Sequence, residues 1–131
     1  WGEWVCVSDY AGTLLAEPGM YMTSGHVVNL SEPISKQNNG IVLVFSEYVN
    51  NAVANQSFHT IFIPKLVVDK HNGVGHCFQL STSNLEYFAT KYLYIHDTHI
   101  TGHNNNNLTG TSSCGITYTN NRFVLRYVIG V

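Results

Sequence analysis

A dense group of histidines and asparagines lies in the segment YLYIHDTHITGHNNNN, residues 92–107. Four potential metal donors fall within eight residues of it: His96, Asp97, His99 and His103. These donor types suit zinc or nickel. On one continuous strand, however, His96 would point to one face and Asp97 and His99 to the other, unless a sharp turn came just before His99. We expect no cofactor and no metal held within one chain, although His96, His99 and His103 could hold a metal, or pack as rings, between copies of the chain.

The same segment has the residue types that bind neutral sugars. Tyr92, Tyr94 and His96 alternate on one face of a predicted strand, and a loop rich in amides and hydroxyls follows. Flat aromatic faces pack against sugar C–H groups, while amides and hydroxyls match the sugar hydroxyls. The alternatives are tyrosines packed in a core or interface, and a solvated asparagine turn. The candidate ligand or intersubunit contacts are Tyr92, Tyr94, His96, His99, His103, Asn104, Asn105, Asn106 and Asn107.

Signatures of catalysis are missing from the sequence. The eight acidic residues are scattered singly, and there is no G-x-S-x-G, P-loop or H-E-x-x-H motif. Cys114, His96 and Asn120 could be read as a nucleophile triad, but no family signature surrounds the cysteine. We therefore expect no enzyme. A glycan depolymerase would need two carboxylates brought within about 5–9.5 Å of each other.

The composition favours neutral partners. Only 11% of the 131 residues are charged and the net charge is -2, without a Lys/Arg cluster. Nucleic-acid binding therefore lacks its main driving force. No apolar run is long enough for a transmembrane helix, so we expect no membrane insertion. Cys6, Cys77 and Cys114 are widely spaced without a CxxC motif, which predicts mostly buried free thiols from a reducing compartment.

We expect one domain over residues 1–131, and because the sequence begins with Trp1 rather than Met, we expect it to be a piece of a longer polypeptide. Helical periodicity is almost absent, and β-branched and aromatic residues dominate the apolar positions. Eight or nine short strands predict an antiparallel β-sandwich or jelly-roll. The predicted strands are Trp4–Ser8, His26–Leu30, Ile41–Tyr48, Phe58–Val68, His76–Ser81, Glu86–Phe88, Tyr92–Thr98, Gly115–Thr119 and Arg122–Ile129.

Two of these strands are apolar on both faces. Residues 41–45 are all apolar. In the last strand, alternation places Phe123, Leu125, Tyr127 and Ile129 on one face and Val124 and Val128 on the other, beside Arg126. Either a second sheet covers these faces or another subunit does. The second reading makes Val124, Arg126 and Val128 intersubunit contacts, and predicts that Asp at position 124 or 126 dissolves the assembly.

The C-terminal third resembles the ends of phage and prophage tail proteins. The resemblance rests on KYLYIHDTHITGH (91–103) and GTSSCGITYTNNRFVLRYVIGV (110–131), with small polar residues, Asn-Asn and a hydrophobic strand ending in Ile-Gly. Upstream, VVNLSEPISKQNNGIVLVF (27–45) and FHTIFIPK (58–65) are similar to segments that precede such an ending. The likeness covers roughly residues 27–131. It is a pattern of strands and turns without a catalytic signature.

The resemblance implies the receptor-binding head of a tail fibre, tail spike or baseplate protein. Such heads are usually β-sandwiches in homotrimers that bind host-surface saccharides. The implied partners are a saccharide, further copies of the chain and other tail or baseplate proteins. The implied location is the virion, after assembly in the bacterial cytoplasm. Because ligand contacts vary among such heads, the resemblance assigns no binding residue. The alternatives are a purely structural trimerisation module and, less favoured, a depolymerase.

Overall fold

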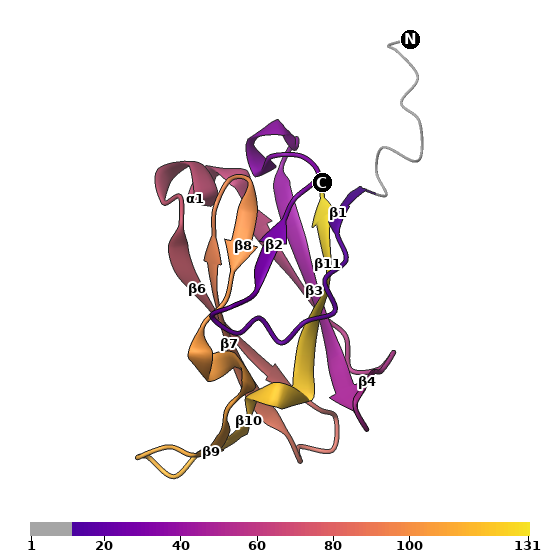
Figure 1. The fold of residues 1–131 in the computed structure, drawn as a ribbon, viewed down its shortest axis with the longest axis vertical. Coiled ribbons are helices and arrows are strands. Elements are labelled where there is room, and N and C mark those ends of the chain that lie inside the picture. The colour runs from indigo at the N-terminus through magenta and orange to yellow at the C-terminus, as the bar shows by residue number, and fades with distance from the viewer. Residues whose placement is uncertain (1–11) are drawn as a thin grey trace.

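The computed structural model describes residues 12–131, which form antiparallel sheets (Figure 1). This confirms the all-β antiparallel class. In one sheet β3 (Gly40–Val49) pairs on one edge with β11 (Phe123–Gly130), and β11 pairs with β1 (Thr13–Ala16). The other edge of β3 pairs with β5 (His59–Pro64) and β4 (Ala52–Val53). A second sheet has the order β2 (Val27–Asn29), β8 (His99–Thr101), β7 (Phe88–Ile95) and β6 (Val74–Ser81). A two-stranded hairpin consists of β9 (Thr109–Thr111) and β10 (Thr117–Thr119).

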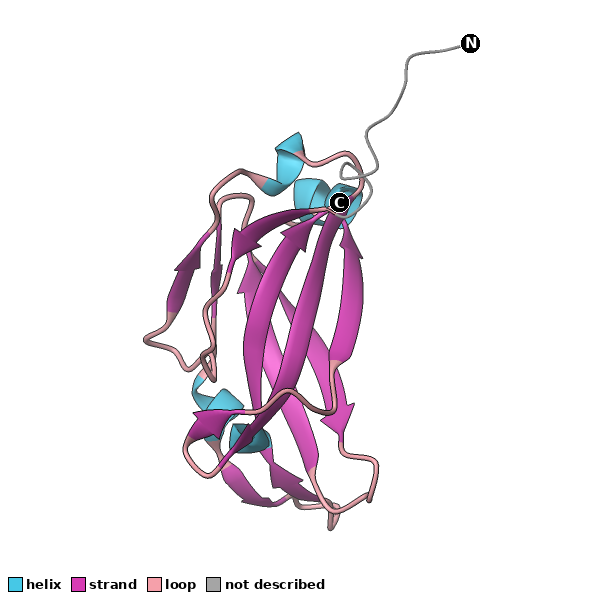
Figure 2. Cartoon of the chain, turned by 90° about the vertical axis from the view of Figure 1, so that its right-hand side faces the viewer, coloured by secondary structure: helices cyan, strands magenta, loops and turns pink. Residues whose placement is uncertain are grey.

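The short helices lie between strands. They are α1 (Lys65–Lys70) and the 3-10 helices η2 (Ile34–Lys36), η3 (Asn104–Asn107) and η4 (Asn120–Arg122). Figure 2 shows the long strands running side by side, with the helical turns gathered at the two ends. No helix within residues 12–131 has the length and apolar character needed to cross a membrane.

One hydrophobic core joins the two larger sheets. Phe45 of β3 meets Phe78 of β6 with ring centroids 5.6 Å apart, and Leu93 of β7 is fully buried in the same cluster. A polar link spans the sheets as well, because a ring nitrogen of His59 lies 2.9 Å from the carbonyl oxygen of Ser81. Alternate residues of the central strands therefore point inward, as the period of two requires.

The C-terminal strand β11 changes face in its middle. Its register with β3 shifts between Leu125 and Tyr127, so a bulge at Arg126 moves the alternation by one residue. Val128 consequently lies in the core with Leu125. The prediction that Tyr127 and Ile129 share the face of Leu125 is wrong, because a strict period of two does not survive a bulge.

Of the three residues predicted to face another subunit, only Arg126 is partly exposed. Val124 and Val128 are 1% and 0% exposed, so their own chain already covers them. The Arg126 guanidinium donates hydrogen bonds to Ser46 Oγ at 2.9 Å and to Asn55 Oδ1 at 3.0 Å. Arg126 is thus held against its own chain.

A helix replaces the end of the predicted strand Phe58–Val68. The strand β5 ends at Pro64, which has no N–H to donate to a neighbouring strand, and α1 follows at once. Val68 is 2% exposed and packs in the core, which anchors this helix. The prediction of strands with no helix between them is therefore wrong here.

The strand β7 is continuous where the sequence predicted two strands, Glu86–Phe88 and Tyr92–Thr98. Lys91 joins them, with its side chain fully buried and its ammonium group bound to two backbone carbonyls. The strand then ends at Ile95, and a turn over residues 96–98 leads directly into β8. The early end of this strand decides where the histidines lie.

Several strands were not predicted at all: β1, β4, β8 and β9. They have only two to four residues, which gives too few positions for a clear alternation. The predicted strand Trp4–Ser8 lies outside the described residues. The predicted strands at 26–30, 41–48, 76–81 and 122–129 correspond to β2, β3, β6 and β11 within two residues at each end.

Candidate functional site

Three of the candidate residues form an aromatic cluster on the outward face of the second sheet. Tyr92 and Tyr94 are half-buried along β7, whereas Leu93 between them is fully buried. The Tyr92 and Tyr94 rings lie 5.3 Å apart with their planes at 81°. The His103 ring lies 5.6 Å from Tyr92 with the planes at 87°. The Tyr92 ring is thus nearly perpendicular to the other two. We call Tyr92, Tyr94 and His103 the aromatic corner.

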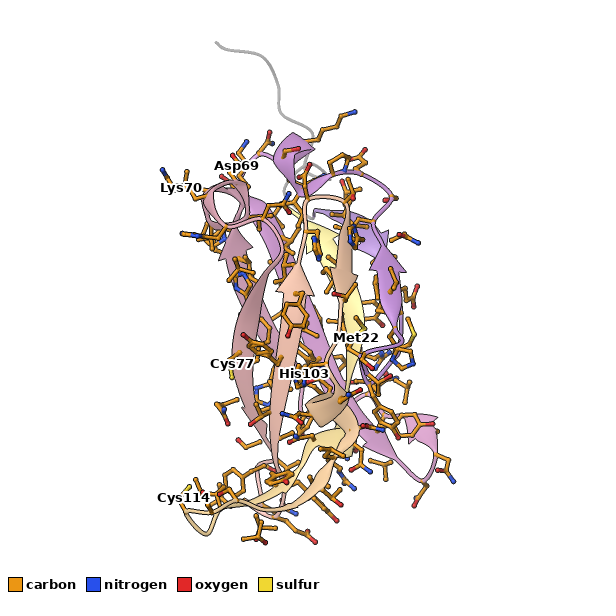
Figure 3. All side chains as sticks on the ribbon, turned by 60° about the vertical axis from the view of Figure 1, so that its left-hand side comes forward. Met22, Asp69, Lys70, Cys77, His103 and Cys114 are labelled. Carbon is orange, nitrogen blue, oxygen red and sulfur yellow. The ribbon has the colours of Figure 1, made fainter. Side chains whose placement is uncertain are left out.

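A glycine leaves room for this aromatic corner. Gly75 of β6 pairs with Tyr94, and the end of the Tyr92 ring occupies the space that a Cβ atom at position 75 would take. Any side chain there would push the ring away from the strand. Cys77, the partner of Tyr92 in the register, is exposed beside the corner. Figure 3 shows Cys77 and His103 on the same side of the molecule.

The third ring of the corner is fixed by a helix cap. His103 precedes η3, and its Nδ1 accepts the backbone N–H of Asn105 at 3.0 Å. The accepting nitrogen carries no proton, so the neutral ring carries its hydrogen on Nε2. His103 therefore adds a hydrogen-bond donor to an otherwise tyrosine-lined surface.

Asn106 of the asparagine run is structural. It is 0% exposed, and its Oδ1 accepts the backbone N–H of Tyr92 at 2.8 Å. Its Nδ2 donates to the carbonyl oxygens of Tyr92 at 2.9 Å and of Met22 at 2.5 Å. The amide is fully used inside the protein, so Asn106 is not available to a ligand.

The other three asparagines of the run are exposed. Asn104 accepts a hydrogen bond from the Ser24 hydroxyl at 2.5 Å. The side chains of Asn105 and Asn107 make no hydrogen bond to any residue within 12–131. The predicted amide-rich loop thus offers two free amides rather than four.

Asn120 is a second buried asparagine, which the sequence did not mark as a binding or structural residue. Its Oδ1 accepts the backbone N–H of Thr90 at 2.8 Å, and its Nδ2 donates to the carbonyl of Asn105 at 2.7 Å. β8 pairs with β7 only at Tyr94 and Ile95. Along the earlier part of the same edge of β7, the side chains of Asn106 and Asn120 take the place of a strand partner. The two side chains fix the segment around η3 against the sheet, and with it the aromatic corner.

His96 and His99 form a separate pair. The backbone N–H of His96 donates to the carbonyl of His99 at 2.9 Å, and the rings stack 4.1 Å apart with their planes at 10°. Burial and the neighbouring His99 imidazole both lower the pKa of His96. The prediction that these two residues point to opposite faces is wrong, because the strand turns before His99.

The three histidines proposed as metal ligands are not brought together. His103 packs with the tyrosines, whereas His96 stacks on His99. Asp97 accepts hydrogen bonds from the backbone N–H and hydroxyl of Ser35, at 2.8 Å and 3.1 Å. Among the described residues, no three His, Cys, Asp or Glu side chains gather into a set that could hold a metal ion. A metal shared between copies of the chain stays a prediction.

A cleft of about 430 Å³ is lined in part by the buried Asn120, and we call it the hairpin cleft. The β9–β10 hairpin, which projects at one end of the molecule in Figure 1, forms one of its walls. None of the described residues that line it has a side chain of Asp, Glu, Lys, Arg or His. Among its lining residues are Gln79, Thr90, Asn105, Leu108, Ile116 and Tyr118.

Comparison with models of known protein families, with curated proteins and with solved structures gives no match. The functional conclusion therefore rests on the chemistry of the aromatic corner and the hairpin cleft, together with the sequence pattern. These two features share Asn105, whose backbone N–H donates to His103 Nδ1 and which also lines the cleft.

Both cysteines in the described part of the chain are exposed, so the prediction of buried thiols is wrong for Cys77 and Cys114. Cys6 lies outside the described residues. A hydrogen bond with the Ser112 hydroxyl lowers the pKa of the Cys114 thiol. The structure gives His96 and Asn120 other partners, a second histidine and backbone groups, so the nucleophile triad is not assembled.

Proposed function

We propose that the chain is the receptor-binding head of a phage tail fibre, tail spike or baseplate protein, and that it adheres to a host-surface saccharide without chemistry. It acts in the virion, at the outside of the bacterial host, after assembly in the host cytoplasm. Its partners are the saccharide, further copies of itself and other tail or baseplate proteins. No cofactor is required.

The observation that carries this proposal is the aromatic corner beside an uncharged cleft. Three half-buried rings, of which Tyr92 stands nearly at right angles to the other two, offer faces and edges to sugar C–H groups. The His103 N–H and the free amide of Asn105 supply hydrogen bonds for sugar hydroxyls. Each such site is weak, and several copies on one fibre would raise the affinity through avidity.

The first prediction concerns the aromatic corner. Tyr94→Ala and Asn105→Ala should each weaken saccharide binding by about tenfold, the equivalent of about 1.4 kcal/mol. A glycan array identifies the responsive saccharide, and a calorimetric titration then measures both variants. Leu66→Ala, which removes an exposed side chain from α1, is the matched control and should bind like the wild type. Unchanged saccharide binding in both site variants would contradict the assignment of Tyr94 and Asn105 as ligand contacts.

A homotrimeric β-sandwich is the assembly that we propose for this head. Support comes from an apolar row across the outer face of the first sheet, in which each residue pairs with the next: Leu14, Ile129, Val42 and Phe62. Leu14 and Phe62 are 52% and 51% exposed. An exposed apolar row of this kind is typical of a subunit contact. It also favours the second candidate function, a structural module that trimerises a fibre without binding a ligand.

The second prediction concerns this apolar row. Light scattering should give the wild type three times the 14.6 kDa mass of one chain, and Phe62→Asp should reduce it to one chain. A charge in a buried contact has no partner, which is why dissociation is expected. Val124→Asp is unsuitable, because Val124 is buried in its own chain. Leu66→Asp is the matched control; a trimeric Phe62→Asp or a monomeric wild type would contradict the prediction.

A further inference from the structure

We propose that the hairpin cleft is a subsite for an uncharged sugar that carries an acetamido group. The inference deepens the proposed saccharide adhesion and rests on it. Its first support is charge: the described lining residues include no Asp, Glu, Lys, Arg or His. A carboxylate, phosphate or ammonium group would lose water there without gaining a partner of opposite charge, which is costly. The cleft therefore selects a neutral glycan.

The polar side chains of the cleft have unused hydrogen-bonding capacity. The Asn105 amide is exposed and makes no side-chain hydrogen bond to the described residues. Gln79 Oε1 accepts the Thr90 hydroxyl at 3.2 Å, whereas its Nε2 has only a contact of 3.9 Å to the Cys77 sulfur. A side-chain amide can accept from the N–H and donate to the C=O of an acetamido group. The cleft thus has the complement of that group.

Apolar side chains line the cleft together with these amides. Leu108 and Ile116 line the cleft and are 45% and 58% exposed, so they would gain by being covered. Burying one methyl group contributes about 0.8 kcal/mol. The acetamido methyl provides such a group, whereas a plain hexose and a free amino sugar both lack it.

Tyr118 provides a ring for the sugar itself. It pairs with Gly110, and its hydroxyl oxygen lies 2.9 Å from the position that a Cβ atom at residue 110 would take. The ring therefore lies across the glycine, as the Tyr92 ring does across Gly75. The volume of about 430 Å³ falls within the roughly 300–1,000 Å³ of small-molecule sites. A glycan bound in the cleft could reach the aromatic corner over Asn105.

The experiment titrates the whole chain with trisaccharides of one linkage that differ only in the substituent: hydroxyl, free amine or acetamido. Both the gluco and the galacto series are used. In at least one series, the acetamido trisaccharide should bind about tenfold tighter than the other two. Tyr118→Ala and Ile116→Ser should remove this preference, whereas Leu66→Ser should keep it. Thermal melts check that each variant is folded.

The outcomes separate the subsite from the adhesion itself. If the hydroxyl and acetamido trisaccharides bind equally, and Tyr94→Ala weakens both, the subsite is overturned while saccharide adhesion stands. The subsite is also overturned if a preference for acetamido survives in both Tyr118→Ala and Ile116→Ser. If no saccharide of either series or of a glycan array binds, the subsite and the adhesion both fall.

Discussion

Replacing Asn106 with alanine is expected to lower the free energy of unfolding by about 3–5 kcal/mol. The Asn106 side chain satisfies the backbone N–H and C=O of Tyr92 and the C=O of Met22. The residue is 0% exposed, so bulk water does not reach the three groups. Each buried polar group left without a partner costs about 1–3 kcal/mol, which explains the size of the effect.

Urea denaturation followed by far-UV circular dichroism measures this difference. Asn107→Ala is the matched control, because Asn107 is the exposed neighbour in the same run. Its effect should stay within about 0.5 kcal/mol. Asn106→Asp keeps the shape but has no N–H for the two carbonyls, so it should destabilise strongly as well. Equal free energies of unfolding for Asn106→Ala and Asn107→Ala would show that the hydrogen bonds of the Asn106 side chain do not stabilise the fold.

The sequence predicts the fold well where a strand is long and simple. The β3 strand follows from a run of β-branched and aromatic residues, and β6 from its place between the turn sequences KHNG (70–73) and STSN (81–84). It fails where a single residue changes the local geometry. The bulge at Arg126 reverses the face of β11 after Leu125, and Pro64 ends β5 early. Neither a bulge nor its position follows from the alternation of apolar residues, because both depend on the neighbouring strand.

The candidate site could be predicted only in part. The alternation of Tyr92 and Tyr94 placed both on one face, and His103 joins them in the structure. The sequence did not indicate the burial of Asn106, because its partners are the backbone groups of Tyr92 and Met22, which lie 14 and 84 residues away in the sequence. The hairpin cleft was missed for a similar reason. The only sequence signal for it is Gly110, seven residues before a Thr-Tyr-Thr strand whose tyrosine needs a glycine opposite.

Lys91 is the other residue whose removal should have a large effect, and that effect depends on pH. The side chain is fully buried, and Nζ donates to the carbonyl oxygens of Asn106 at 2.6 Å and of Tyr21 at 3.1 Å. Burial lowers the pKa of Lys91 from the ordinary 10.5 to about 7. Lys91 thus binds the backbone of η3, whose Asn106 side chain binds the backbone of β7, so the protonation of Lys91 is linked to the stability of the loop after His103.

The unfolding free energy of the wild type should rise relative to that of Lys91→Met by about 2–3 kcal/mol between pH 7 and pH 9. In this range the unfolded chain keeps the lysine proton, since its pKa is near 10.5, whereas the folded chain has released it. Unfolding then takes up a proton, so a higher pH favours the folded state. Below about pH 7 both states carry the proton and Lys91 contributes no further pH dependence.

Urea denaturation of both proteins at pH 6, 7, 8 and 9 measures the difference, in which the other titrating groups cancel. The methionine keeps the length and apolar stem of the lysine but removes its charge and its donors. At any pH it leaves two carbonyls without a partner, which shifts the whole curve without changing its slope. The slope therefore reports only the proton on Nζ. If the difference in unfolding free energy stays constant from pH 7 to pH 9, Lys91 remains charged inside the protein. Its two carbonyl partners and the Tyr21 ring, 5.5 Å away, would then offset the cost of its burial.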